Sequence, residues 1–425
     1  MSSRTNGAAI TQDRAVHDHH PAGLIGPARA GASYLPGLDG LRALAIVAVL
    51  VFHANARWLP GGFLGVDLFF VISGFIITRA LLAEWDARGR VDIAAFWMRR
   101  ARRLLPAVFL LITAALVYCA FFERGDVARL RQDTLAALVY ATNWYQISGG
   151  QSYFASLAPP SLLQHLWSLA VEEQFYLVWP LLLSAALFVL PRRVLAPLLA
   201  LGAAASTTEM ALLYQHGASV SRLYYGTDTR AAGLLIGSAL ALSPGIWMES
   251  RATSRLWPAA RQVCGWLSLA LLAGICLSID DSGAVLYNGG FAVVSLASAG
   301  MIIAAIHPAA LLSRILERAP LRWLGRRSYG IYLWHWPIFV LMQPHLSFTG
   351  GAVLVSACQI AAAIVIAAIS YRFVEEPIRH GALTRSRRWL QHQLRRRTFT
   401  MSWAVGMSAG LAIFLAIWIV RIPAP

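Results

Sequence analysis

Residues 38–54 read LDGLRALAIVAVLVFHA, an apolar stretch long enough for a membrane helix that nevertheless carries ionisable side chains. Asp39 and Arg42 lie near its start, and His53 lies near its end. Arg42 and His53 are separated by about three helical turns, or about 16 Å of rise, so they share one face near opposite sides of a bilayer. Ionisable groups at membrane depth usually face a cavity or a partner. This pattern indicates part of a site.

The composition indicates that the whole chain, and not only residues 38–54, belongs to a membrane protein. Its 425 residues are 58% hydrophobic and 13% charged, with a mean hydropathy of +0.58, values that exclude an ordinary soluble domain of this size. The four cysteines lie in apolar runs without metal-type spacing, so we expect buried apolar side chains and no metal site. The net charge of +16 does not indicate nucleic-acid binding, because the arginines gather in short loops between apolar runs.

We expect an all-α membrane bundle with about ten core transmembrane helices and one further C-terminal transmembrane helix. Residues 127–147 are expected to be amphipathic or re-entrant, because charged side chains occupy their first half. Residues 1–34 are expected to form a disordered cytoplasmic tail, and residues 381–401 a basic cytoplasmic linker after a membrane domain at 35–380. The expected spans are 38–56, 63–83, 104–122, 165–190, 194–214, 230–244, 262–279, 286–306, 328–346, 352–372 and 402–421.

The distribution of basic residues predicts the orientation. All 36 of them are arginine, and a cytoplasmic N-terminus places 27 in the tail and inner loops, seven outside and two within spans. This bias predicts an N-terminus inside and a C-terminus outside. A full span at 127–147 would invert every later loop and abolish the bias.

Two side chains are candidates for acid–base chemistry. His53 can accept a proton from a hydroxyl near neutral pH; the alternative is a structural histidine bonded between helices. Glu172, in HLWSLAVEEQFYLVWP at 165–180, shares a helix face with His165 and Tyr176 and is our choice for a buried functional acid. Glu173 points about 100° away, and the alternative for both carboxylates is a structural ion pair.

A third acidic candidate is Asp67, in GVDLFFVISGFIIT at 65–78. Its carboxylate would orient His53 or bind an acceptor hydroxyl. Ser73 and Gly74 in the same stretch permit close helix packing.

Arginines supply the candidate anion site. FWMRRARRLLP at 96–106 places Arg99, Arg102 and Arg103 at helical spacing near a cytoplasmic entrance, where they would suit a nucleotide-bearing donor with several phosphates. Arg42 has the same capacity. Membrane anchoring is the alternative for the cluster, and a local pair with Asp39 is the alternative for Arg42.

The segment SYGIYLWHWPIF at 328–339 supplies the candidate acceptor site. Ser328, Tyr332 and His335 share one face of its helix. Trp334 and its aromatic neighbours would form an interfacial belt or stack on sugar rings. FVEEPIRH at 373–380 is expected to be a solvated helix end. No P-loop, HExxH or nucleophile elbow occurs in the sequence.

The six stretches that begin at residues 38, 65, 96, 165, 328 and 373 together resemble the acyltransferase-3 family of integral membrane O-acyltransferases. They occur in that family's order, and Arg42 and His53 form its R-x10-H signature. The resemblance implies ten helices, an acyl-CoA donor on the cytoplasmic side and a sugar-type acceptor on the outer side. It implies that His53 is the catalytic histidine and that Arg99 and Arg102 are the basic pair near the donor.

The resemblance also assigns Glu172 to the family's acidic position and His335 to its late histidine. An eleventh helix at 402–421 is typical of members that continue into a periplasmic SGNH-type domain, whereas this sequence stops at Pro425. We therefore expect either a separate periplasmic transferase that delivers the acyl group or a core that needs no such help.

The expected function is an inner-membrane O-acyltransferase. Arg42, Arg99 and Arg102 would hold the phosphates of acyl-CoA, a co-substrate, with no tightly bound cofactor. His53, oriented by Asp67 or Glu172, would deprotonate the acceptor, by direct transfer or through a covalent acyl-histidine. His335, Tyr332 and Trp334 would bind that acceptor.

Acetyl is the default acyl group, with succinyl or longer chains left open. The acceptor would be a lipid-linked or other cell-envelope glycan, or a secreted small molecule, reached within membrane lipid. The alternative function is a transporter or flippase for a glycolipid or small molecule, which would use the same buried charges without chemistry.

Overall fold

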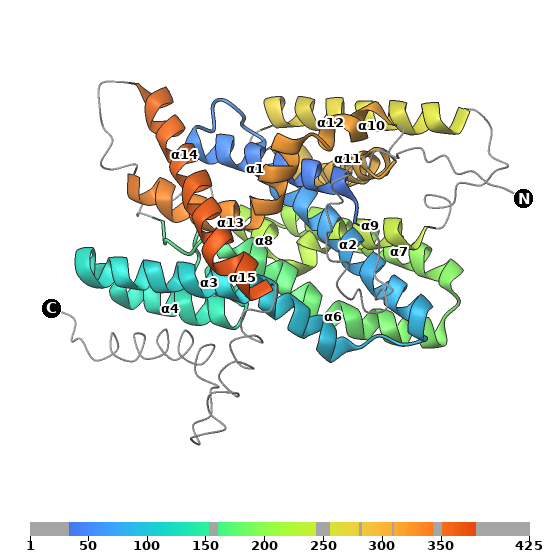
Figure 1. Ribbon diagram of the computed structural model, residues 1–425, viewed down its shortest axis with the longest axis horizontal. Helices are drawn as coiled ribbons and strands as arrows, with labels where there is room; N and C mark the ends of the chain where they lie inside the picture. The colour runs from blue at the N-terminus through green and yellow to red at the C-terminus, as the bar shows by residue number, and fades with distance from the viewer. Residues whose placement is uncertain are drawn as a thin grey trace, which may run out of the picture.

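The computed structural model describes residues 34–152, 160–243, 256–279, 283–307, 310–342 and 351–379. These residues form helices and connecting turns with no strand, which confirms the all-α expectation. Figure 1 shows the helices packed into one bundle, with α14 crossing one end and α10 lying along an edge. The expected N-terminal tail up to residue 33, the basic linker and the span at 402–421 lie outside the described residues.

Among the described residues, a helix overlaps each of the ten expected core spans, although α3 and α13 begin earlier than expected. Within the described part of the chain, seven helical stretches are long and apolar enough to cross a bilayer, those containing α1, α2, α3, α7, α10, α11 and α14. The ten are α1 (Pro36–Ala54), α2 (Gly65–Arg88), α3 (Ile93–Phe122), α6 (Leu166–Val189), α7 (Arg192–Gln215), α9 (Thr227–Leu242), α10 (Leu256–Ser278), α11 (Phe291–Ala305), α13 (Ala319–Met342) and α14 (Ala352–Ser370).

Shorter helices complete the bundle: α4 (Val127–Leu138), α5 (Thr142–Ser148), α8 (Val220–Tyr225), α12 (Leu311–Leu316) and α15 (Glu376–Arg379). Residues 127–147 thus form two short helices in place of one span. The chain reverses between them at Tyr140, whose φ of 54° is left-handed. This agrees with the expectation that the segment does not cross the membrane.

The outer faces of several helices are apolar. Helices α6, α7, α10 and α14 expose large aliphatic side chains, among them Leu182, Leu201, Leu267 and Leu354, each more than half exposed. Contiguous apolar surface of this kind indicates contact with lipid. The protein is therefore a multi-pass membrane protein, as its hydropathy indicates.

Glycines let the central helices approach closely. A Cβ on Gly74 of α2 would lie 2.0 Å from the carbonyl oxygen of Leu234 in α9, and a Cβ on Gly237 of α9 would lie 2.0 Å from that of Val71. On the other side, a Cβ on Gly325 of α13 would lie 1.7 Å from the carbonyl oxygen of Asp39 in α1. Such small-residue contacts are a common means of packing membrane helices.

We expect Gly74→Ala to lower the melting temperature, because the added methyl group forces α2 and α9 apart, at a cost of about 1–3 kcal/mol for overpacking. Thermal unfolding of the detergent-solubilised protein measures the effect. Gly274→Ala in α10 is the matched control, because its Cβ meets nothing within 4 Å among the described residues and alanine is the better helix former. Equal melting temperatures for the two variants would contradict the packing argument.

Candidate functional site

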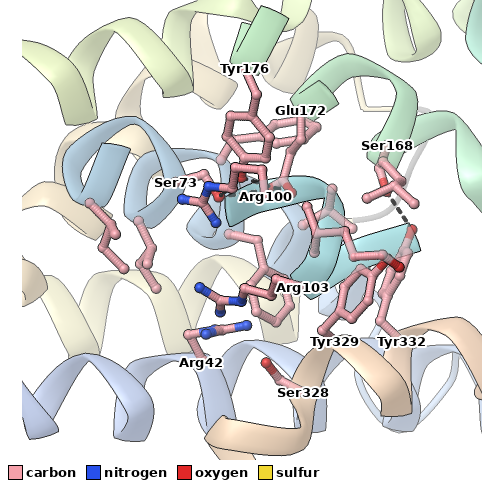
Figure 2. Close-up of a pocket in the computed structure, with 17 residues that line it drawn as sticks. Arg42, Ser73, Arg100, Arg103, Ser168, Glu172, Tyr176, Ser328, Tyr329 and Tyr332 are labelled. Carbon is pink, nitrogen blue, oxygen red and sulfur yellow. Dashed lines mark hydrogen bonds between the residues drawn. The ribbon is translucent and has the colours of Figure 1, made fainter. Parts of the chain in front are cut away.

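A cavity of about 90 Å³ lies between α1, α2, α3, α6 and α13 (Figure 2). Since one water molecule needs roughly 10–15 Å³ of such space, the cavity has room for several waters or a slender chain. Its polar lining residues are Arg42, Ser73, Arg100, Arg103, Ser168, Glu172, Tyr176, Ser328, Tyr329 and Tyr332, and its apolar ones are Val66, Phe69, Phe70, Ile72, Ile76, Leu104 and Leu169.

Glu172 anchors the acidic side of this cavity. Its Oε1 accepts a hydrogen bond of 2.7 Å from the Ser73 hydroxyl. The Tyr176 hydroxyl lies 3.0 Å from Ser73 Oγ and 3.3 Å from Glu172 Oε2, and the Arg100 guanidinium lies 4.8 Å from the centre of the Tyr176 ring. The structure thus brings Glu172 to the cavity, whereas Glu173 is buried but is not among the lining residues described.

Three arginines from two helices converge on the same space. Figure 2 shows the guanidinium groups of Arg42 and Arg103 together, with Arg100 beside them. Glu172 is the acidic residue among the lining residues described, so positive charge is in excess. Planar guanidinium groups in this arrangement suit phosphate or carboxylate oxygens.

Of the three α3 arginines that the sequence offered, the structure places Arg103 at the cavity, together with Arg100, whereas Arg99 and Arg102 are not among the lining residues described. Arg99 pairs with Glu84 at 3.0 Å and keeps 56% of its side chain exposed, and Arg102 is exposed. Arg100 and Arg103 have the same spacing, one residue further on. The apolar residues of α3 carry the signal that identifies this face, because the buried Phe96, Leu104 and Ala107 recur in phase with the inward pair.

A cluster of histidines lies beyond the cavity. The ring of His53 is 5.0 Å from that of His335 and 5.1 Å from that of Trp336, and His165 is 5.7 Å from His335. No three His, Cys, Asp or Glu side chains of the described residues have the arrangement of a metal site. A neutral imidazole can donate, accept or transfer a proton.

Backbone carbonyls fix the tautomers of two of these imidazoles. His53 Nδ1 lies 2.9 Å from the carbonyl oxygen of Val49, and His335 Nδ1 lies 2.6 Å from that of Tyr332. A carbonyl can only accept, so in the neutral rings Nδ1 carries the proton and Nε2 carries the lone pair. Nε2 of His335 is buried without a partner among the described residues.

Tyr332 connects the two compartments. It lines the cavity, its ring lies 5.2 Å from that of His335, and its hydroxyl donates to the His165 carbonyl at 2.9 Å. Ser168 Oγ lies 2.6 Å from the same hydroxyl. His53 is not among the lining residues described, so Tyr332 is the lining residue that lies beside the histidine cluster.

Short helices position the chain that leads into α6. Ser161 donates a hydrogen bond of 2.5 Å to Asp133 of α4, and its carbonyl accepts one of 2.8 Å from Trp336 Nε1 of α13. Gln146 of α5 donates to the Gln164 carbonyl. Burial raises the pKa of Asp133, against the opposing hydrogen bond from Ser161. The α4–α5 pair thereby holds the residues that precede His165.

Asp67 has a partner that the sequence did not indicate. Both of its carboxylate oxygens accept from Arg230 Nη2 of α9 at 2.8 Å, and both side chains are almost fully buried. The guanidinium of Arg230 also lies 4.0 Å from the centre of the Phe291 ring. The count of outside arginines includes Arg230, but its side chain lies in the bundle. The carboxylate of Asp67 therefore serves an ion pair within the core.

The remaining acceptor candidate, Trp334, packs half-buried against apolar clusters that include Leu333 and Ile331. It is not among the cavity-lining residues described. Of the three residues assigned to acceptor binding, the structure therefore places Tyr332 in the cavity and His335 in the histidine cluster.

Comparison with known proteins gives a match to a family model and to several named relatives. The family model described as an acyltransferase domain, Acyl_transf_3, matches residues 35–372. Over 356 residues the chain is 42% identical to the peptidoglycan O-acetyltransferase OatA of Listeria monocytogenes, a match that covers 83% of this chain and 57% of that protein. No solved structure matches the chain.

Two further relatives are similar to this chain. The putative peptidoglycan O-acetyltransferase YrhL of Bacillus subtilis is 40% identical over 387 residues, which cover 90% of this chain and 60% of that protein. The O-acetyltransferase OatA of Staphylococcus aureus is 39% identical over 346 residues, which cover 81% and 57%. The chain thus spans less than two thirds of the length of these relatives.

We expect Arg230→Met to destabilise the protein by about 3–5 kcal/mol, because it leaves the buried carboxylate of Asp67 without its partner. The double variant Asp67→Leu/Arg230→Met removes both charges and should recover most of the loss. Thermal unfolding in detergent measures both. If the double variant is no more stable than Arg230→Met, the ion pair does not account for the effect.

Proposed function

The chain belongs to the acyltransferase-3 family, and from this membership we propose that it is a membrane O-acetyltransferase acting on a cell-envelope glycan. The relatives named as O-acetyltransferases support the acetyl group, and those named for peptidoglycan support a glycan acceptor. The observation that carries the proposal is the arginine-lined cavity that meets a histidine cluster at Tyr332.

The proposed donor is acetyl-CoA, which enters from the cytoplasmic side. Arg42, Arg100 and Arg103 bind its phosphates, and Glu172, with Ser73 and Tyr176, offsets part of their mutual repulsion. The bias of arginines toward the inner loops supports this direction of entry, because it places the start of α3 inside. The same bias supports a cytoplasmic N-terminus in the bacterial inner membrane.

In the proposed reaction, His53 removes the proton of an acceptor hydroxyl on the outer side. The hydroxyl oxygen forms a bond to the acetyl carbonyl carbon, the carbon–sulfur bond breaks, and the thiolate of CoA takes up the proton. The Nδ1–carbonyl bond of His53 makes Nε2 the nitrogen that accepts the proton. The same nitrogen would carry the acetyl group if transfer proceeds through acyl-histidine.

We expect His53→Ala to reduce acetyl transfer by about 10²–10⁴-fold, the usual contribution of a general base. The assay uses the full chain in lipid nanodiscs, labelled acetyl-CoA and a soluble peptidoglycan fragment. His216→Ala is the control, because that imidazole also bonds to a backbone carbonyl through Nδ1 but lies exposed at the end of α7. Transfer that survives in folded His53→Ala would refute the proposed mechanism.

Variants of two arginine pairs in α3 distinguish donor binding at the cavity from donor binding at the protein surface. We expect Arg100→Ala/Arg103→Ala to raise the KM for acetyl-CoA by at least tenfold, since a hydrogen bond to a charged group contributes about 1.5–3 kcal/mol. Arg99→Ala/Arg102→Ala, with equal loss of charge, should leave it within about twofold. Steady-state kinetics measure both variants. The opposite ranking would assign donor binding to Arg99 and Arg102.

A further inference from the structure

Ser328 of α13 has an unsatisfied hydroxyl inside the cavity. The residue is fully buried, lines the cavity, and its Oγ has no hydrogen-bond partner among the described residues. Figure 2 shows this hydroxyl directed from α13 toward Arg42 and Arg103. A buried hydroxyl without a partner is unfavourable, so a bound group that completes its hydrogen bonding gains that free energy.

The pantetheine arm of the donor has two amides. We propose that Ser328 binds the amide further from the thioester, and so sets the depth of the thioester in the bundle. This inference rests on the proposed function. A serine hydroxyl both donates and accepts, so it can bind either the carbonyl or the N–H group of an amide. The arginines, which only donate, suit the phosphates.

The axial distance along α13 matches Ser328 to the arm. Ser328 precedes His335 by about two helical turns, or about 10.5 Å of rise, whereas Arg42 and His53 are about 16 Å apart along α1. In an extended arm with backbone-like bond lengths, the two amides lie about 5 Å and about 10 Å from the thioester carbonyl, and the first phosphorus about 17 Å. With the thioester at the histidine cluster, the further amide reaches Ser328 and the phosphates reach Arg42.

The surroundings of Ser328 also fit a slender uncharged chain. Tyr332 lies one turn further along α13 with its hydroxyl already bonded to the His165 carbonyl, and Phe69 and Leu169 add apolar lining. Ser328 is therefore the lining hydroxyl of α13 that has no described partner.

Binding assays on the purified full chain test the assignment. We expect Ser328→Ala to weaken the binding of coenzyme A by about 3- to 10-fold, the effect of one hydrogen bond. Its binding of 3′-phosphoadenosine 5′-diphosphate, which has the phosphates but no arm, should equal that of the wild type. Without ligand, the melting temperature of Ser328→Ala should not fall, because the substitution removes an unsatisfied group.

Ser298→Ala in α11 is the matched control, since that fully buried hydroxyl donates to Val294 within its own helix. Unchanged coenzyme A binding in Ser328→Ala would overturn the inference. So would an equal loss of nucleotide binding, or a fall in melting temperature beyond that of Ser298→Ala. If the wild type itself binds no coenzyme A, the proposed function fails as well, which distinguishes the two failures.

Discussion

A charged side chain at membrane depth must find its partners inside the protein, because lipid offers none. This constraint organises the bundle. Asp67 and Arg230 form a buried ion pair across α2 and α9, and Glu172 accepts a hydrogen bond from Ser73 of α2. The three arginines of the cavity share one acidic residue, Glu172, among the lining residues described, so an anionic ligand would be stabilised there.

The polar groups of the cavity and of the histidine cluster follow one another along α1 and α13. Arginines and the hydroxyls of Ser328, Tyr332 and Ser168 line the cavity, and the imidazoles lie beyond Tyr332. This order follows from the sequence of the two helices, since α1 carries Arg42 and His53 and α13 carries Ser328 and His335. The close contact of Gly325 in α13 with Asp39 in α1 holds the two helices together.

Helix positions and the main polar residues could be predicted from the sequence because long apolar runs and the spacing of Arg42, His53 and Glu172 are local properties. The α3 arginines show the limit of this approach. Neighbouring residues on a helix differ by about 100° in direction, so the spacing of the arginines alone does not show which of them face inward. The apolar residues in phase with Arg100 and Arg103 carry that signal. The pairing of Asp67 with Arg230 depends on a contact between distant segments. The helical periodicity of the sequence does not predict such a contact.

Helix α1 carries both ends of the proposed reaction path on one rigid rod. The start of this helix is closely packed, because a Cβ on Gly37 or Gly40 would overlap the carbonyl oxygen of Ala305 or Leu316. Deleting one residue between Arg42 and His53 would shorten the rod by only about 1.5 Å but would turn the imidazole by about 100°. The helix therefore fixes the direction of the imidazole as well as its distance from Arg42. A change in direction disrupts this arrangement more than a change in distance.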